Sequence, residues 1–304
     1  MLLAPPATLT VAIMTYNRPA HLRNCLASVR RHLPGAPVLV MDDASDDPAQ
    51  LALLEEARTM DGVRVIVASG DKGFHGGLYG NMQRALAECD TRFLLYLQED
   101  TQLVRSPDAT DMDHVEQALA PTDAAFVYPF FIKAIKKKAG WTATPSDVPG
   151  SLQIRTRDNA LRPWNFYADI CIADVQALRA AGWRFQPSEG ANGQQAQSLF
   201  RPMQWLHAPW GFYCPEVPIF RWRARSRSLA QRILPARVRE NAFFHDMDAD
   251  SVLRLRNRPA NTLPFAEDYL TTTRKVRRPF VYQDVKSTRL SHLVWTLETK
   301  LFKR

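Results

Sequence analysis

Three apolar segments of this sequence each end at a group of polar residues that could do chemistry. The apolar segments are residues 11–14, 38–41 and 93–97. The polar groups that follow them are Thr15-Tyr16-Asn17-Arg18, Asp42-Asp43-Ala44-Ser45 and Gln98-Glu99-Asp100. Open α/β sheets bind their ligands at the carboxyl ends of such strands. The pattern therefore indicates an enzyme that acts on a nucleotide-linked substrate.

The elements that must position these groups alternate between strand and helix. The predicted strands and helices are, in chain order, residues 8–16, 19–32, 38–41, a helix opened by Asp46-Asp47-Pro48, 63–68, 80–89 and 93–97. Ser45 or Asp46 is expected to cap the second helix. Strands that alternate with helices imply an α/β fold, in which a mostly parallel, Rossmann-like sheet is flanked by helices on both faces.

After residue 105 the pattern is weaker. Residues 126–131 resemble a strand, residues 133–141 and 148–157 a hairpin, and residues 172–181 a short helix. A clear helical pattern returns over residues 284–304. Its apolar stripe consists of Leu290, Leu293, Val294, Leu297 and Leu301.

The composition is typical of a globular protein, since 46% of the 304 residues are hydrophobic and seven are Trp. No apolar run approaches the roughly 20 residues that cross a bilayer. The first six residues lack the basic and apolar regions of a signal peptide. The four cysteines are widely spaced, which favours reduced thiols over zinc ligands or disulfides. We therefore expect a cytoplasmic protein.

The net charge of +8 is concentrated in the second half of the chain, where residues 221–239 contain seven arginines and no acid. Clustered cations imply an anionic partner, which could be membrane lipid, nucleic acid or a phosphorylated substrate. A solvated basic surface is the alternative. Few aromatic residues interleave with these arginines, and the segment matches no recognition module, so we expect no nucleic-acid partner.

The order of four short motifs, TYNR, DDAS, GGxxxN and ED, resembles the inverting glycosyltransferases of family 2, which have the GT-A nucleotide-sugar-binding fold. The resemblance is good over residues 8–105 and loose over residues 160–222. It implies a GT-A domain over residues 1–222, with a nucleotide-sugar-binding half (8–105) and an acceptor-binding half (106–222). Residues 223–304 would form a basic C-terminal helical extension.

The resemblance assigns the first motifs to the nucleotide-sugar donor. Thr15, Tyr16, Asn17 and Arg18 would cradle the base, and Arg18 could meet a phosphate. Asp43 would accept a hydrogen bond from the N3–H of uracil or thymine, whereas Asp42 could equally cap the next turn. In the glycine-containing loop, the expected donor contacts are Lys72, Gly73 and Asn81.

The resemblance also implies a divalent cation, Mg²⁺ or Mn²⁺, at the end of the fourth predicted strand. Asp100 aligns with the metal-binding Asp of the family, and Glu99 would bind the sugar or a metal-bound water. Gln98 replaces the more usual first Asp. Further along, Phe220 stands where relatives often carry a His, so Arg221 would neutralise phosphate instead.

The family usually places the catalytic base in an acidic motif that opens a helix in the second half. In this sequence the corresponding pair is Gln194-Gln195, and amides cannot serve as bases. Glu189, on a loop that contains glycine, is the nearest carboxylate, and Asp169 is a second option. The alternative for Glu189 is an exposed loop acid.

These features predict a metal-dependent hexosyltransferase that moves a sugar, with inversion, from a UDP- or dTDP-linked donor to a glycan or lipid-linked acceptor in cell-envelope polysaccharide synthesis. The alternative is a nucleotide-binding or regulatory protein of the same fold that has lost catalysis. The C-terminal helix could lie on the anionic inner face of the cell membrane. It could instead dock on the core or form a homo-oligomer.

Overall fold

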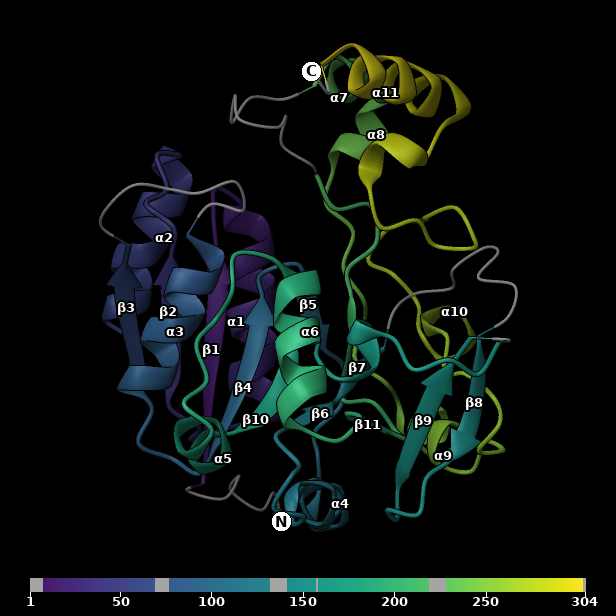
Figure 1. The fold of residues 1–304 in the computed structure, drawn as a ribbon. Coiled ribbons are helices and arrows are strands. Elements are labelled where there is room, and N and C mark those ends of the chain that lie inside the picture. Colours follow the sequence, from purple (N-terminus) through teal and green to yellow (C-terminus); the bar gives the residue numbers. More distant parts are fainter. Residues whose placement is uncertain (1–7, 69–76, 132–140, 157, 219–227, 303–304) are drawn as a thin grey trace.

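A nine-stranded sheet crosses the computed structural model, which describes residues 8–68, 77–131, 141–156, 158–218 and 228–302. Its strands follow the order β3-β2-β1-β4-β10-β6-β11-β9-β8 (Figure 1). In that order they are β3 (Val63–Val67), β2 (Val38–Asp42), β1 (Leu9–Thr15), β4 (Phe93–Gln98), β10 (Cys171–Asp174), β6 (Phe126–Tyr128), β11 (Gln204–Leu206), β9 (Ser151–Arg155) and β8 (Thr142–Pro145).

The first four strands of this sheet are parallel, as the sequence predicts. In register, Thr15 of β1 lies opposite Asp42 of β2, and Met14 lies opposite Gln98 of β4. Every residue of β1 is buried, because helices pack on both faces of the sheet (Figure 1). The α/β fold class is therefore confirmed. Beyond β4 the sheet becomes mixed, since β10 runs antiparallel to both β4 and β6.

The helices begin where the sequence supplies helix-starting residues. They are α1 (Pro19–His32), α2 (Pro48–Arg58), α3 (Leu78–Glu88), α4 (Ala109–Leu119), α5 (Val175–Ala180), α6 (Glu189–Leu199), α7 (Leu229–Arg232), α8 (Ala236–Arg239), α9 (Ala249–Arg256), α10 (Ala266–Tyr269) and α11 (Arg289–Phe302), with 3₁₀ turns η1 (Pro163–Asn165) and η2 (Asp284–Lys286). Proline opens α1 and α2, where its fixed φ suits the first turn.

The expected cap of α2 is wrong. Asp47, not Ser45 or Asp46, accepts hydrogen bonds from the backbone N–H groups of Ala49 and Gln50, at 2.9 and 3.1 Å. Ser45 is engaged elsewhere, because its hydroxyl donates to Asp42 at 2.6 Å. Asp42 therefore holds the turn after β2, which was one of its two expected roles.

Two predicted elements of the second half are also wrong in part. Residues 126–131 form two strands, β6 in the large sheet and β7 (Phe130–Phe131) in a three-stranded sheet with β5 (Thr101–Leu103) and β12 (Gly211–Tyr213). The helix predicted over residues 172–181 begins only at Val175, because β10 pairs with β4 before it. Strand β9 lies within the second predicted arm of the hairpin, but its partner β8 follows the first predicted arm, of which residues 133–140 lie outside the described residues.

The C-terminal chain packs closely on the first part of the molecule. The side chain of Gln102 hydrogen-bonds both the N–H and the C=O of Phe244, at 2.9 and 2.7 Å. Val217 donates its N–H to the carbonyl of Tyr282 at 2.7 Å. Helices α7, α8 and α11 lie together on the side to which the carboxyl end of β4 points (Figure 1). Among the described residues, no helix combines the length and the apolar character needed to cross a bilayer.

A buried ion pair supports this packing. The guanidinium of Arg105, 2% exposed, donates to both carboxylate oxygens of Asp111 at 2.6 and 2.7 Å, and Arg256 of α9 reaches the same carboxylate. We expect Arg105→Ala to lower the free energy of unfolding by about 3 kcal/mol, because it leaves part of a buried charge uncompensated. Urea unfolding measures this, with Arg23→Ala as the control. Arg23 pairs with Glu56 at the surface, where about 1 kcal/mol or less is at stake.

Candidate active site

Two carboxylates follow β4 at the carboxyl edge of the parallel strands. Glu99 and Asp100 are 4% and 1% exposed. Glu99 is paired with Arg18, which follows β1, at 2.8 Å between Nη1 and Oε1. Burial raises the pKa of Glu99 above its ordinary value, and the charge of Arg18 offsets part of that shift. The structure thus brings Arg18, Glu99 and Asp100 together, as the strand-end pattern predicts.

Tyr282 completes this cluster from the C-terminal chain. Its hydroxyl donates a hydrogen bond to Oδ2 of Asp100. The other carboxylate oxygen, Oδ1, is buried and accepts no hydrogen bond from the described residues. Segment 281–284 holds Tyr282 here by pairing with residues 216 and 217. Nothing in the local sequence around residue 282 signals this contact, because it spans 182 residues.

The open oxygen of Asp100 tests whether the site fits a divalent cation. A buried carboxylate oxygen without a donor suits a hard cation, which takes oxygen ligands. In the part of the chain that the structure describes, no three His, Cys, Asp or Glu side chains converge as a ready-made metal site. A cation at Asp100 would therefore take most of its ligands from substrate phosphates and water, as Mg²⁺ commonly does. The residues present fit such an ion.

Several of the expected donor contacts also hold the local fold. Thr15 accepts a hydrogen bond from Gln50 at 2.9 Å. Asn17 fixes the loop before α2, because its Oδ1 accepts from the N–H groups of Asp46 and Asp47, both at 3.0 Å. Tyr16 follows β1 between these two residues and is half-buried. The side chains of Thr15 and Asn17 therefore hold the loops that follow β1 and β2 in place.

Asp43 anchors the start of α3. Its Oδ1 accepts the backbone N–H of Gly77 at 2.9 Å. A Cβ on Gly77 would lie 2.2 Å from that oxygen, so a larger residue here would displace the Asp43 carboxylate. Asn81, one turn further along α3, is buried on the same side. The expected contacts Lys72, Gly73 and Arg221 lie outside the described residues.

Glu189 is the first residue of α6, with Ser188 as its N-cap. The structure therefore corrects the predicted position of the helix opening, since Gln194-Gln195 lies within α6. Asn192, fully buried, fixes the entry: its side chain bonds both the N–H and the C=O of Gln186, at 2.8 and 3.0 Å. Glu189 itself is exposed, so a substrate can reach it.

Asp169 and Glu189 form a second pair of acids. The Tyr79 hydroxyl donates to Oδ2 of Asp169 at 3.2 Å and hydrogen-bonds the backbone of Glu189. Burial, followed by the negative charge of Glu189, raises the pKa of Asp169 from 3.8 to about 7. The nearby negative charge of Glu189 favours the protonated form of Asp169. The structure thus brings together the two carboxylates predicted as catalytic candidates.

This shift gives a pH dependence of stability. Folded Asp169 binds a proton up to higher pH than the unfolded chain does, so the group destabilises the fold as pH rises from about 4 to about 7. We expect Asp169→Asn to flatten the decline in unfolding free energy between pH 5 and pH 8, by on the order of a few kcal/mol. Urea unfolding at both pH values measures it. An unchanged slope, matching that of the exposed control Asp123→Asn, would contradict the shift.

Two tyrosines lie between the clusters. The hydroxyl groups of Tyr128 and Tyr213 are 3.4 Å apart, and the ring of Tyr213 meets that of Tyr282 edge-on at 5.8 Å. Burial and the neighbouring Tyr128 raise the pKa of Tyr213, and the negative charges of Glu189 and Asp100 raise it further. Tyr213 therefore lies within electrostatic range of both acids. Sequence reasoning missed these tyrosines, which come from separate strands and loops.

The sequence and the fold were compared with known proteins. The model of glycosyl transferase family 2 matches residues 10–165. No curated protein matches the sequence. The crystal structure of S. aureus TarS 1-349 in complex with UDP is similar, with a TM-score of 0.50 and 16% identity over 67% of this chain and 60% of that chain. The complex of TarS 1-349 with UDP-GlcNAc has a TM-score of 0.49 and 15% identity, over 67% of this chain and 58% of that one.

At such identities the UDP complex shows a common fold. The chain spans about 60% of the length of the TarS 1-349 structures that it matches. The residues matched by the family model include β1, the strand-end acids after β4 and the hairpin β8–β9.

Proposed function

The chain belongs to glycosyl transferase family 2, and on that premise we propose that it transfers a hexose, with inversion, from a UDP-linked donor to a hydroxyl group of a glycan or glycolipid. The observation that carries this proposal is the position of Glu189. It opens α6 near Asp169, and its charge and that of Asp100 both act on Tyr213. One end of the site is therefore suited to a diphosphate and its cation, and the other to a base.

In the proposed reaction, Glu189 removes the proton from the acceptor hydroxyl as that oxygen attacks the anomeric carbon of the sugar. The bond from this carbon to the phosphate oxygen breaks, and UDP leaves with the electron pair. Attack from the face opposite UDP inverts the configuration. The Tyr79 hydroxyl, which donates to Asp169 and hydrogen-bonds the backbone of Glu189, would hold the base in place.

The donor would bind at the carboxyl edge of β1, β2 and β4. UDP bound to the TarS structure of the same fold supports a uridine nucleotide here, and Asp43 stands where the base would be recognised. Thr15, Tyr16, Asn17 and Asn81 line the expected path, and the positive charge of Arg18 acts on Glu99 and Asp100. Lys72, Gly73 and Arg221 remain candidates for the diphosphate.

A divalent cation, Mg²⁺ or Mn²⁺, would be held by Asp100, with Glu99 acting through a coordinated water. When bound, such an ion neutralises the charge that develops on the diphosphate. Tyr282 would orient Asp100 by occupying its other oxygen, and a second layer of this kind often tunes metal affinity.

We expect Tyr282→Phe to raise the Mn²⁺ concentration for half-maximal turnover by about 10–100-fold, because it removes the hydrogen bond that orients Asp100. Turnover at saturating Mn²⁺ should change much less. UDP release from UDP-sugar, measured against Mn²⁺ concentration, checks this. Tyr269→Phe, in α10 of the same C-terminal chain, is the control. Equal Mn²⁺ dependence in both variants would show that Tyr282 has no part in metal binding.

The donor class is tested by calorimetric titration of UDP, dTDP, GDP and CDP, each with and without Mn²⁺. Selective, Mn²⁺-dependent binding of UDP is expected, and binding of none of the four would contradict the proposal. UDP release from UDP-sugars then separates an enzyme from a protein that only binds nucleotide. The acceptor would belong to cell-envelope polysaccharide synthesis, at the cytoplasmic face of the membrane.

A further inference from the structure

Helix α11 presents its apolar stripe outward. Leu290, Leu293, Leu297 and Leu301 are 62%, 58%, 52% and 72% exposed. Their spacing of three or four residues places them on one face of the helix. A helix that only docks on a core turns this face inward. The exposed stripe therefore has no partner among the described residues.

Polar contacts fix the rotation of α11. Glu298, which is buried, accepts the backbone N–H groups of Leu229 and Ala230 at 3.1 and 3.3 Å. Ser291, also buried, donates its hydroxyl to the carbonyl of Val285 at 2.7 Å. Both residues lie on the protein-facing side, so the leucines cannot turn inward without breaking these bonds. Their exposure is built into the fold.

The chain around α11 carries the positive charge of the protein. Residues 223–304 contain 18 Lys and Arg against eight Asp and Glu, whereas residues 1–222 contain 21 and 23. The net charge of +8 therefore comes entirely from the C-terminal part. On α11 itself, Arg289 and Lys300 are exposed beside the leucine stripe.

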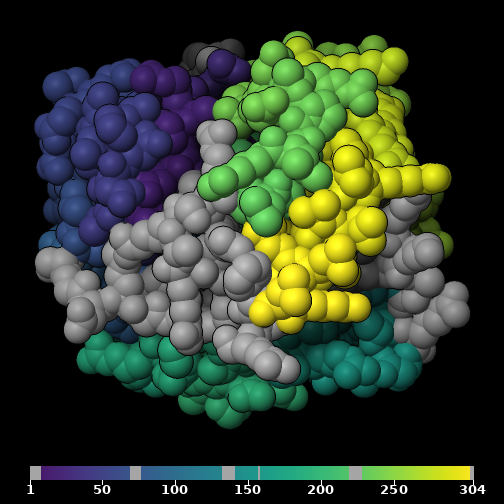
Figure 2. Space-filling model, turned by 90° about the horizontal axis from the view of Figure 1, so that it is seen from above, coloured from purple at the N-terminus to yellow at the C-terminus, as the bar shows by residue number. Residues whose placement is uncertain are grey.

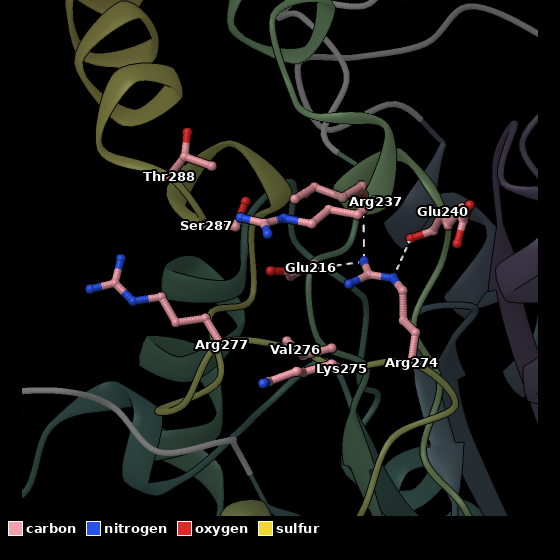
Figure 3. Close-up of a pocket in the computed structure, with 10 residues that line it drawn as sticks. Glu216, Arg237, Glu240, Arg274, Lys275, Val276, Arg277, Ser287 and Thr288 are labelled. Atoms are coloured by element: carbon pink, nitrogen blue, oxygen red, sulfur yellow. Dashed lines mark hydrogen bonds and ion pairs between the residues drawn. The ribbon is translucent and has the colours of Figure 1, made fainter.

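A basic pocket of about 440 Å³ opens where α11 begins. Arg237, Lys275 and Arg277 line it, together with the acids Glu216 and Glu240 and with Ser287 and Thr288. Figure 3 shows Arg237 extending across the pocket towards Ser287, and Arg277 on the outer side. All three cations are exposed, and within the described ranges none of them forms an ion pair. Arg274, by contrast, is paired with Glu216 at 2.7 Å.

Helix α11 lies on the same side of the molecule as the carboxyl ends of the parallel strands (Figure 1). The carboxyl end of β4, which carries Asp100, points towards the side occupied by α7, α8 and α11 (Figure 1). Seen from that side, the green and yellow residues of the C-terminal chain lie on the right of the face, and the purple and blue N-terminal residues lie on the left (Figure 2).

We propose that this C-terminal face docks on an anionic lipid bilayer. The leucines of α11 insert into the interface, and Arg237, Lys275 and Arg277 meet lipid phosphates. The excess of cations matches an anionic surface, which a second copy of this chain would not offer. The stripe of a 14-residue helix also covers only about 200 Å², far below the roughly 800 Å² per partner of a standard interface.

The test is co-sedimentation of the full chain with phosphatidylcholine vesicles, with and without phosphatidylglycerol, and without donor or acceptor. This inference goes beyond the transfer reaction, so its failure would leave the proposed activity untouched. Binding only to the anionic vesicles is expected. The double variant Leu293→Ser/Leu297→Ser should weaken it more than about tenfold. The matched control Leu51→Ser/Leu253→Ser removes two equally exposed leucines elsewhere and should leave binding within about twofold.

Charge is tested separately with Lys275→Gln/Arg277→Gln, which should weaken binding by about fivefold for each charge removed at low salt. Absence of wild-type binding at low salt would overturn the proposal. Equal losses of vesicle binding in Leu293→Ser/Leu297→Ser and in Leu51→Ser/Leu253→Ser would also overturn it. Inorganic phosphate that binds calorimetrically while vesicles do not would show a free-phosphate pocket instead. Dimerisation abolished by Leu293→Ser/Leu297→Ser, without vesicle binding, would show a second copy as the partner.

Discussion

Glu189→Gln is expected to lower kcat for sugar transfer by about 10²–10⁴-fold, because glutamine keeps the shape of the side chain and cannot take the acceptor proton. The dissociation constant for UDP should not change, since the donor contacts lie at the other end of the site. Turnover is measured as UDP release from UDP-sugar with acceptor. Glu55→Gln, an exposed acid on α2, is the control and should retain full activity.

A second variant tests whether the base lies at residue 189, where the structure begins α6, or at residue 194, where the sequence analysis places the helix opening. Gln194→Glu in the Glu189→Gln background restores an acid at the position that sequence alone suggests for the helix opening. It should not restore turnover, because five residues further along α6 a side chain points about 140° away. Recovery of activity in this double variant would move the base to residue 194. Full activity in Glu189→Gln would leave Asp169 as the remaining candidate.

The start of α6 shows why the sequence analysis placed the helix opening at Gln194-Gln195 instead of at Glu189. Ser188 followed by an acid is a helix-starting signal, but Gly190 and Gly193 make the segment look like a loop. Gly193 is there for packing: a Cβ would lie 2.8 Å from the carbonyl oxygen of Pro163 in η1. A glycine required by a tertiary contact cannot be told from a loop glycine without the structure.

The parallel half of the fold was predictable because its signals are local. Apolar runs followed by polar residues mark β1, β2 and β4, and Pro19 marks the first residue of α1. The strand β10 was not predictable in the same way, since four residues before a helix read equally well as its first turn. Only the pairing of residues 171–174 with β4 identifies them as a strand.

The site was predictable on its strand-end side and not on its tyrosine side. Arg18, Glu99 and Asp100 follow strands that adjoin in the sheet, so sequence places them together. Tyr282 meets them through the pairing of segments 281–284 and 216–217, and Tyr213 through the pairing of β12 with β5. No short-range pattern contains that information.

Asp100→Asn is expected to lower kcat by about 10³-fold and to abolish the Mn²⁺ dependence of UDP binding. A bound cation stabilises developing charge by several kcal/mol, and each 1.36 kcal/mol is about tenfold in rate. Asparagine can still accept the hydrogen bond from Tyr282, so the fold should persist. Calorimetric titration of UDP with and without Mn²⁺ checks the binding, and Asp123→Asn, whose carboxylate lies at the surface, is the control.

A double-mutant cycle then decides whether Tyr282 acts through Asp100. If it does, Tyr282→Phe changes the Mn²⁺ dependence in the wild-type background and adds nothing in the Asp100→Asn background, because the group that it orients no longer binds metal. Additive losses would mean that Tyr282 contributes to the site on its own, through its ring against Tyr213. Mn²⁺-stimulated turnover that survives in Asp100→Asn would show that the cation is held elsewhere.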